Sequence, residues 1–123
     1  MLSCNQQTKP GNAKGLLRNN QIEMEGYKCE VNDTYTAFIA ASINLPYMEG
    51  NHSIPMNKHE QFSVSLDVYA NIVCLCPVCH RLLHYGTEKP KRMILNGLYE
   101  QRAQRLVNSG IVLSKDEFVN MVI

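Results

Sequence analysis

The chain has 123 residues and a mass of 14.0 kDa, which is enough material for one domain with one modest core. A hydrophobic content of 45% and a charged content of 19% are typical of a folded protein and exclude a disordered chain. No stretch approaches the roughly 18 consecutive apolar residues of a membrane span, and the N-terminus has no basic or apolar region of the signal-peptide kind. We therefore expect a soluble, cytoplasmic protein.

The first half of the chain predicts one helix and short extended segments. Residues 1–12 are polar and are expected to form a tail or linker before a single domain over residues 13–123. Apolar residues fall at helical spacings over residues 13–26. Residues 27–31 are expected to form a strand, and residues 38–43 fit either a short helix or a strand.

The second half predicts a strand followed by helices. Residues 56–70 are expected to form an irregular loop, and the apolar residues 72–75 a strand. A compact helix is predicted over residues 78–85 and a longer one over residues 90–108. The segment Ser114–Glu117 is a capping box that opens a last short helix. This order of elements favours the α+β class.

Charge is distributed unevenly along the chain. Residues 23–67 contain seven acidic and two basic side chains, whereas residues 80–110 contain six basic and two acidic ones. The second region therefore has an excess of four positive charges and is the better candidate for contact with phosphates, with a solvated helix face as the alternative. The candidate DNA-binding residues are Arg81, Arg92, Arg102 and Arg105.

The cysteines favour a metal site over disulfides. Their number is five, which is odd, and three of them crowd together at Cys74, Cys76 and Cys79. A disulfide framework usually has an even number of widely spaced cysteines. In a reducing compartment, Cys76-Pro77-Val78-Cys79 instead indicates half of a metal site.

Two histidines directly follow this pair. The i, i+4 spacing of His80 and His84 puts both imidazoles on one helix face, where they can reach one ion. Two other polar segments stand out, Asn51-His52 after a probable strand and Asn71 before the strand over residues 72–75.

Together these segments resemble the HNH nuclease family over residues 27–110. The family pattern is Glu-x-His-His-x-x-Pro-Leu, then Asn-Ile or Asn-Leu, then Cys-Pro-x-Cys-His-x-x-x-His. It corresponds here to Glu49–Met56, Asn71-Ile72 and Cys76–His84. The leading Tyr27-Lys28-Cys29 and the helical tail are most similar to the restriction-enzyme-like branch. The resemblance implies a small ββα-metal core over about residues 27–86, with flanking helices that include C-terminal helices over residues 90–123.

The resemblance also implies roles for individual residues. His52 matches the general base that activates water, and His80 and His84 match two ligands of one divalent metal ion. Asn71 is expected to bond backbone across the loop and to hold His52 in place. Asn51 stands where the family usually has His or Asp as a metal ligand. Two imidazoles and one amide oxygen favour Mn²⁺, Ni²⁺, Co²⁺ or Zn²⁺, with Mg²⁺ also open.

A second, structural zinc ion is common in such nucleases. Here its ligands would be Cys29, Cys76 and Cys79 with a fourth group shortly after Cys29, but residues 32–36 contain no obvious fourth ligand. Cys4 is too distant in sequence to be assigned. The alternatives are an intact zinc site and a set of buried cysteines.

These observations predict a metal-dependent DNA endonuclease of the restriction type. No separate specificity domain is visible, so we expect a homodimer or a separate specificity domain or partner to select the DNA. Two rival hypotheses remain open. One is a catalytically weakened HNH-like module that only binds nucleic acid, and the other is a structural zinc-binding interaction module.

Overall fold

The computed structural model describes residues 13–123, so the expected tail over residues 1–12, with Cys4, lies outside the described residues. It combines helices with two small antiparallel sheets, which confirms the α+β class. The elements in chain order are α1 (Ala13–Met24), β1 (Ile39–Ala40), β2 (Leu45–Pro46), β3 (Glu49–His52), the 3₁₀ helices η3 (Met56–Gln61) and η4 (Tyr69–Asn71), β4 (Ile72–Leu75), α2 (Pro77–Tyr85), α3 (Glu88–Asn108) and α4 (Lys115–Val122). Over residues 13–123, no helix has the length and apolar character needed to cross a membrane.

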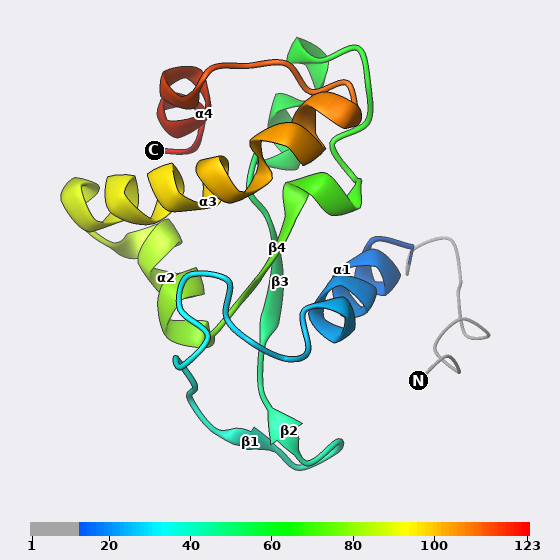
Figure 1. Ribbon diagram of the computed structural model, residues 1–123, viewed down its shortest axis with the longest axis vertical. Helices are drawn as coiled ribbons and strands as arrows, with labels where there is room; N and C mark the ends of the chain where they lie inside the picture. The colour runs from blue at the N-terminus through cyan, green and yellow to red at the C-terminus, as the bar shows by residue number, and fades with distance from the viewer. Residues whose placement is uncertain (1–12) are drawn as a thin grey trace.

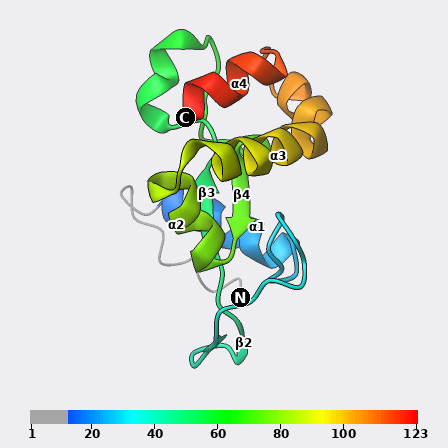
Figure 2. The same cartoon turned by 90° about the vertical axis from the view of Figure 1, so that its left-hand side faces the viewer.

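A central antiparallel pair and the helix after it form the framework of the molecule. Strand β3 pairs with β4, so that Glu49 lies opposite Leu75 and His52 lies opposite Ile72. The pair lies between α1 on one side and α2 on the other, and α3 crosses near one end of it (Figures 1 and 2). All four residues of β4 are buried, as expected for a strand that is covered on both faces.

Helix α2 begins and ends at residues that stabilise helix termini. Cys76 is the N-cap and its sulfur accepts a hydrogen bond from the backbone N–H of Cys79, while Pro77 occupies the first helical position. The helix ends at Gly86. These features fix the start of α2 at Pro77, two residues after the end of β4.

The predicted strand over residues 27–31 is wrong. Gly26 has φ 67° and Tyr27 has φ 59°, so the chain reverses through two successive left-handed residues after α1. The returning segment then forms one backbone hydrogen bond to β4, from Glu30 N–H to the carbonyl of Cys74 at 2.9 Å. It passes β4 as a loop and does not join the sheet.

Residues 38–43, which the sequence left undecided, contain strand β1 and the start of a turn. Strand β1 pairs with β2 through Ile39 and Pro46, and Asn44 in the turn has φ 58°. This β1–β2 hairpin projects from the body of the molecule at the end away from α3 and α4 (Figures 1 and 2).

The buried face of α3 contains one charged residue. Leu95, Leu98, Arg102 and Leu106 are all buried and follow one another at helical spacing. Arg102 is 1% exposed, so its predicted contact with DNA is wrong. The physical reason is its phase on the helix, which directs the side chain into the core with the leucines.

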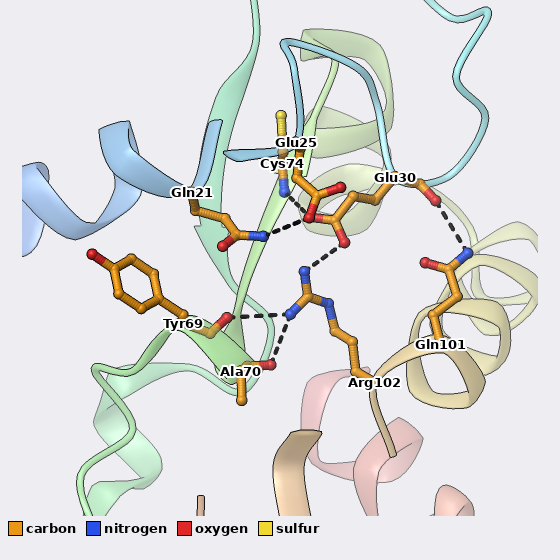
Figure 3. A network of polar contacts seen from close by, with 8 residues as sticks. All are labelled: Gln21, Glu25, Glu30, Tyr69, Ala70, Cys74, Gln101 and Arg102. Atoms are coloured by element: carbon orange, nitrogen blue, oxygen red, sulfur yellow. Dashed lines mark hydrogen bonds and ion pairs between the residues drawn. The ribbon is translucent and has the colours of Figure 1, made fainter. Parts of the chain in front are cut away.

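A carboxylate and two backbone carbonyls accept hydrogen bonds from the two terminal nitrogens of this buried arginine, while its Nε has no partner among residues 13–123 (Figure 3). Its Nη2 lies 2.5 Å from Glu30 Oε1, and its Nη1 donates to the carbonyls of Tyr69 and Ala70. The other oxygen of Glu30 accepts from the backbone N–H of Cys74 at 2.7 Å. Hydrogen bonds and one ion pair of this network therefore connect α3 and the loop over residues 28–31 to β4.

Candidate active site and metal centre

A cleft of about 430 Å³ lies between α1, β3 and α2. It is lined by Arg18, Gly50, Asn51, His52, Ser53, Pro55, Met56, His80, Leu83, His84 and Val122. Four of the residues selected from sequence are thus together in one cleft, namely Asn51, His52, His80 and His84. The proximity follows from the antiparallel pair, which sets the end of β3 beside α2.

His52 is held by a carboxylate that sequence reasoning missed. Its Nε2 lies 2.8 Å from Oδ1 of Asp67, and both side chains are largely buried. An imidazole that donates from Nε2 to a carboxylate has its lone pair on Nδ1, where it can accept a proton. Asp67 lies 15 residues away in an irregular loop, and nothing in the sequence pattern indicates this contact.

His80 in α2 is held in a similar way by a carboxylate of β3. Its Nδ1 lies 2.8 Å from Oε1 of Glu49, which leaves Nε2 as the nitrogen that can bind a metal ion. The rings of His80 and His84 have centroids 4.9 Å apart. Partial desolvation lowers the pKa of His84 below the ordinary value of histidine, with smaller contributions from His80 and Lys91, which favours the neutral form that can coordinate.

Asn71 supports the loop that follows His52. Its Oδ1 accepts from the backbone N–H of Ile54 at 2.8 Å, and its Nδ2 donates to the carbonyls of Ile54 and Leu66. Its own carbonyl accepts from the N–H of Ser53. The predicted bonding of Asn71 to backbone across the loop is confirmed, whereas its role in catalysis stays a prediction.

Two further residues of the cleft were not selected from sequence. Arg18 is the single Lys or Arg among the lining residues, and it approaches the strand closely at Gly50, where an added Cβ would lie 2.7 Å from Cβ of Arg18. Ser53 is buried, and its hydroxyl has no hydrogen-bond partner among residues 13–123. The cation beside the histidines is suited to an anionic ligand, whereas the Ser53 hydroxyl has almost no exposed surface.

The arginines predicted from the basic C-terminal region do not line this cleft. Arg81 and Arg105 are exposed. Arg92 forms an ion pair with Glu88 at 2.8 Å within α3. Their contact with DNA stays a prediction, and Arg102 is excluded from it by burial.

A separate cluster of cysteines lies at the start of α2. The sulfur atoms of Cys29, Cys76 and Cys79 all lie within 4.8 Å of one another, so these residues could hold a metal ion. Burial raises the pKa of the Cys79 thiol, as does its neighbour Cys29. Cys74 is also buried, and burial raises its pKa to about 12, but it is not part of the cluster.

The cluster has three ligands among the described residues. No fourth His, Cys, Asp or Glu of residues 13–123 joins it. The backbone N–H of Cys79 donates to the sulfur of Cys76 at 3.4 Å, so this sulfur already accepts one hydrogen bond.

Comparison of the chain with models of protein families, with curated proteins and with solved structures finds no match. The chemistry of the two clusters is therefore the basis for a functional proposal.

Proposed function

We propose that the protein is a metal-dependent DNA endonuclease of the HNH type. The observation that carries the proposal is the meeting of Asn51, His52, His80 and His84 in one cleft that also contains Arg18. A general base, a pair of imidazole ligands and a cation are suited to metal-assisted hydrolysis of a phosphodiester. The order of these residues along the chain adds the resemblance to the HNH motif.

His52 is the general base in this proposal. Its hydrogen bond to Asp67 fixes the ring and stabilises the imidazolium that forms when Nδ1 accepts a proton from water. The resulting hydroxide attacks phosphorus in line with the leaving 3′ oxygen. In this proposal Arg18 binds an oxygen of the scissile phosphate.

His80, His84 and Asn51 are the metal ligands. The bond from Glu49 to Nδ1 would orient the ring of His80 and leave Nε2 available to hold the ion. When bound, the divalent ion, one of Mg²⁺, Mn²⁺, Ni²⁺, Co²⁺ or Zn²⁺, neutralises charge on the phosphate and on the leaving oxygen. Asn51 contributes an uncharged oxygen and is the weakest of the three donors.

The DNA partner and its selection are also proposals. The exposed Arg81 and Arg105, together with Arg92, extend the phosphate contacts beyond the cleft. Restriction-type cleavage would use a homodimer or a separate specificity domain. The free thiols of the four described cysteines fit a cytoplasmic location.

The second candidate function is a zinc-stabilised module without catalysis. It is favoured by the cysteine cluster, in which three ligand atoms from residues 13–123 lie close enough together to hold a metal ion. In this alternative Cys29, Cys76 and Cys79 bind zinc, and the cleft binds nucleic acid or another partner without cleaving it.

Plasmid nicking separates the two candidates. Supercoiled DNA would be incubated with the protein and each of the five ions, and His52→Ala would be compared with the parent chain. A positioned base is worth about 10²–10⁴-fold in rate, so the variant should lose that much activity and keep its metal content. His59→Ala is the matched control, because His59 is an exposed histidine outside the cleft. Equal cleavage by His52→Ala and the parent would refute the assignment, and no cleavage with any ion would favour the second candidate.

A further inference from the structure

A second cavity, of about 670 Å³, lies beside the cysteine cluster and apart from the histidine cleft. Cys76 and Cys79 form part of its wall, and most of the remainder is apolar side chain from α2 and α3. The polar members of the wall, besides the cysteines, are Glu30, Thr34, Tyr35, Thr36 and Gln101. This size and composition are typical of a site for a small molecule.

The cluster itself lacks a ligand that zinc normally takes. Structural zinc sites are closed by four protein ligands, whereas sites that bind a further molecule have three and leave the fourth position open. Glu30 follows Cys29 directly, but its carboxylate is already bonded to Arg102 and to the N–H of Cys74. Asp33, the next acidic residue, is exposed and is not part of the cluster.

We propose that Cys29, Cys76 and Cys79 bind one thiophilic divalent ion whose fourth position opens into this cavity and accepts a donor atom of a small molecule with an apolar body. Each thiol releases its proton to solvent as it binds the ion. The inference does not depend on nuclease activity, because none of its residues lies in the histidine cleft.

Charge selects the kind of donor. Three thiolates and a divalent ion have a net charge of −1, and all three cysteines are buried. A second negative charge there would be poorly solvated, so a neutral donor is favoured over an anionic one. The ligand class that fits both the ion and the apolar wall is an aromatic nitrogen base with an apolar substituent.

Gly97 offers a way to close the cavity without disturbing the fold. It lies in α3 on the cavity wall, and an added Cβ would have no atom within 4 Å. Gly97→Leu therefore fills the cavity and replaces glycine by a better helix former. Asn96→Leu is the matched control, because the neighbouring Asn96 is exposed and does not line the cavity.

The experiment uses Co²⁺ as the probe ion in the full chain under reducing conditions. Thiolate-to-cobalt charge-transfer bands report the cysteine site alone, because imidazole and amide ligands do not produce them. Cys29→Ser should weaken these bands, whereas Cys74→Ser, which changes a buried cysteine outside the cluster, should leave them intact. Absence of the bands from the parent chain would overturn the proposal.

Imidazole and 4-phenylimidazole then test the open position. Both should shift the cobalt spectrum of the parent chain, and the phenyl compound should bind at least about tenfold more tightly, the effect of burying a ring of that size. Gly97→Leu should abolish this preference, and Asn96→Leu should keep it. An unshifted spectrum would mean a closed site, and loss of band intensity in Cys4→Ser would then identify the closing ligand. A preference that survives Gly97→Leu would equally overturn the proposal.

Discussion

Helix α2 carries two candidate metal sites that differ in their surroundings. Cys76 and Cys79 lie at its beginning and are 2% and 4% exposed, whereas His84, near its end, is exposed. The cysteine end lies beside the cavity of about 670 Å³ between α2 and α3, and the histidine end lines the cleft of about 430 Å³. A nine-residue helix thus joins a site of buried thiols to a site whose imidazoles are partly exposed.

The acidic residues around the two sites differ in the same way. Glu30 is buried with Arg102 beside the cysteine cluster and contributes to the packing of α3. Glu49 and Asp67 are partly exposed, and each bonds a histidine of the cleft. The carboxylate near the cysteines therefore stabilises the fold, whereas those near the histidines orient imidazole rings.

The largest expected effect is on the free energy of unfolding and concerns the buried pair of Glu30 and Arg102. Arg102→Met leaves Glu30 buried without its partner, and loss of one member of a buried ion pair costs about 3–5 kcal/mol. Urea unfolding should show that decrease in the free energy of unfolding. Arg105→Met, at an exposed position on the same helix, should change it by less than about 0.5 kcal/mol.

A companion variant shows whether the loss comes from the unpaired charge. The double variant Glu30→Gln, Arg102→Met removes both charges and should recover part of the stability that Arg102→Met loses. A decrease below about 1 kcal/mol for Arg102→Met would mean that the buried pair does not hold α3 to the rest of the fold.

A smaller effect is expected for the carboxylates that bond the histidines of the cleft, and it concerns metal affinity and cleavage rate. Glu49→Gln replaces the carboxylate that bonds Nδ1 of His80, and such partners of metal-binding histidines are worth about 10–100-fold in affinity. Titration calorimetry with Mn²⁺ or Ni²⁺ should show the loss. Asp67→Asn is the matched variant, because Asp67 contacts the proposed base and not the proposed ligands, so it should lower the cleavage rate at unchanged metal affinity. Equal affinities in Glu49→Gln and the parent chain would remove Glu49 from the metal site.

Local signals explain which parts of this structure could be predicted. The strand over residues 72–75 was predicted correctly because four consecutive apolar residues end just before Pro77. The capping box at Ser114 likewise identified the start of α4, since both of its hydrogen bonds are formed between residues three apart. The histidine pair was selected because its spacing is local to one helix.

The errors and omissions have a different physical origin. The strand over residues 27–31 was predicted from apolar residues, but Gly26 and Tyr27 adopt left-handed conformations that turn the chain away from the sheet. Arg102 was selected for its charge, although its spacing from Leu98 and Leu106 places it on the buried face of α3. The contacts of Asp67 and Arg18 with the cleft depend on tertiary packing, for which the sequence has no local signal.

The smallest expected effect concerns Asn51, where the chain departs from the HNH pattern. Asn51→His would place a third imidazole in the cleft beside His80 and His84, and imidazole is a stronger donor to these ions than an amide oxygen. We expect an affinity for Ni²⁺ or Co²⁺ about tenfold higher, equivalent to about 1.4 kcal/mol. Asn51→Leu, which removes the amide oxygen at similar size, should weaken binding, and both variants should unfold at the same urea concentration as the parent.

The gain in affinity of Asn51→His should also depend on pH, because a protonated imidazole cannot coordinate while an amide oxygen does not titrate. The affinity ratio of Asn51→His to the parent should therefore shrink as the pH falls through about 6.5, the ordinary pKa of histidine. Identical affinities in all three proteins would place Asn51 outside the metal site and leave His80 and His84 as its only protein ligands.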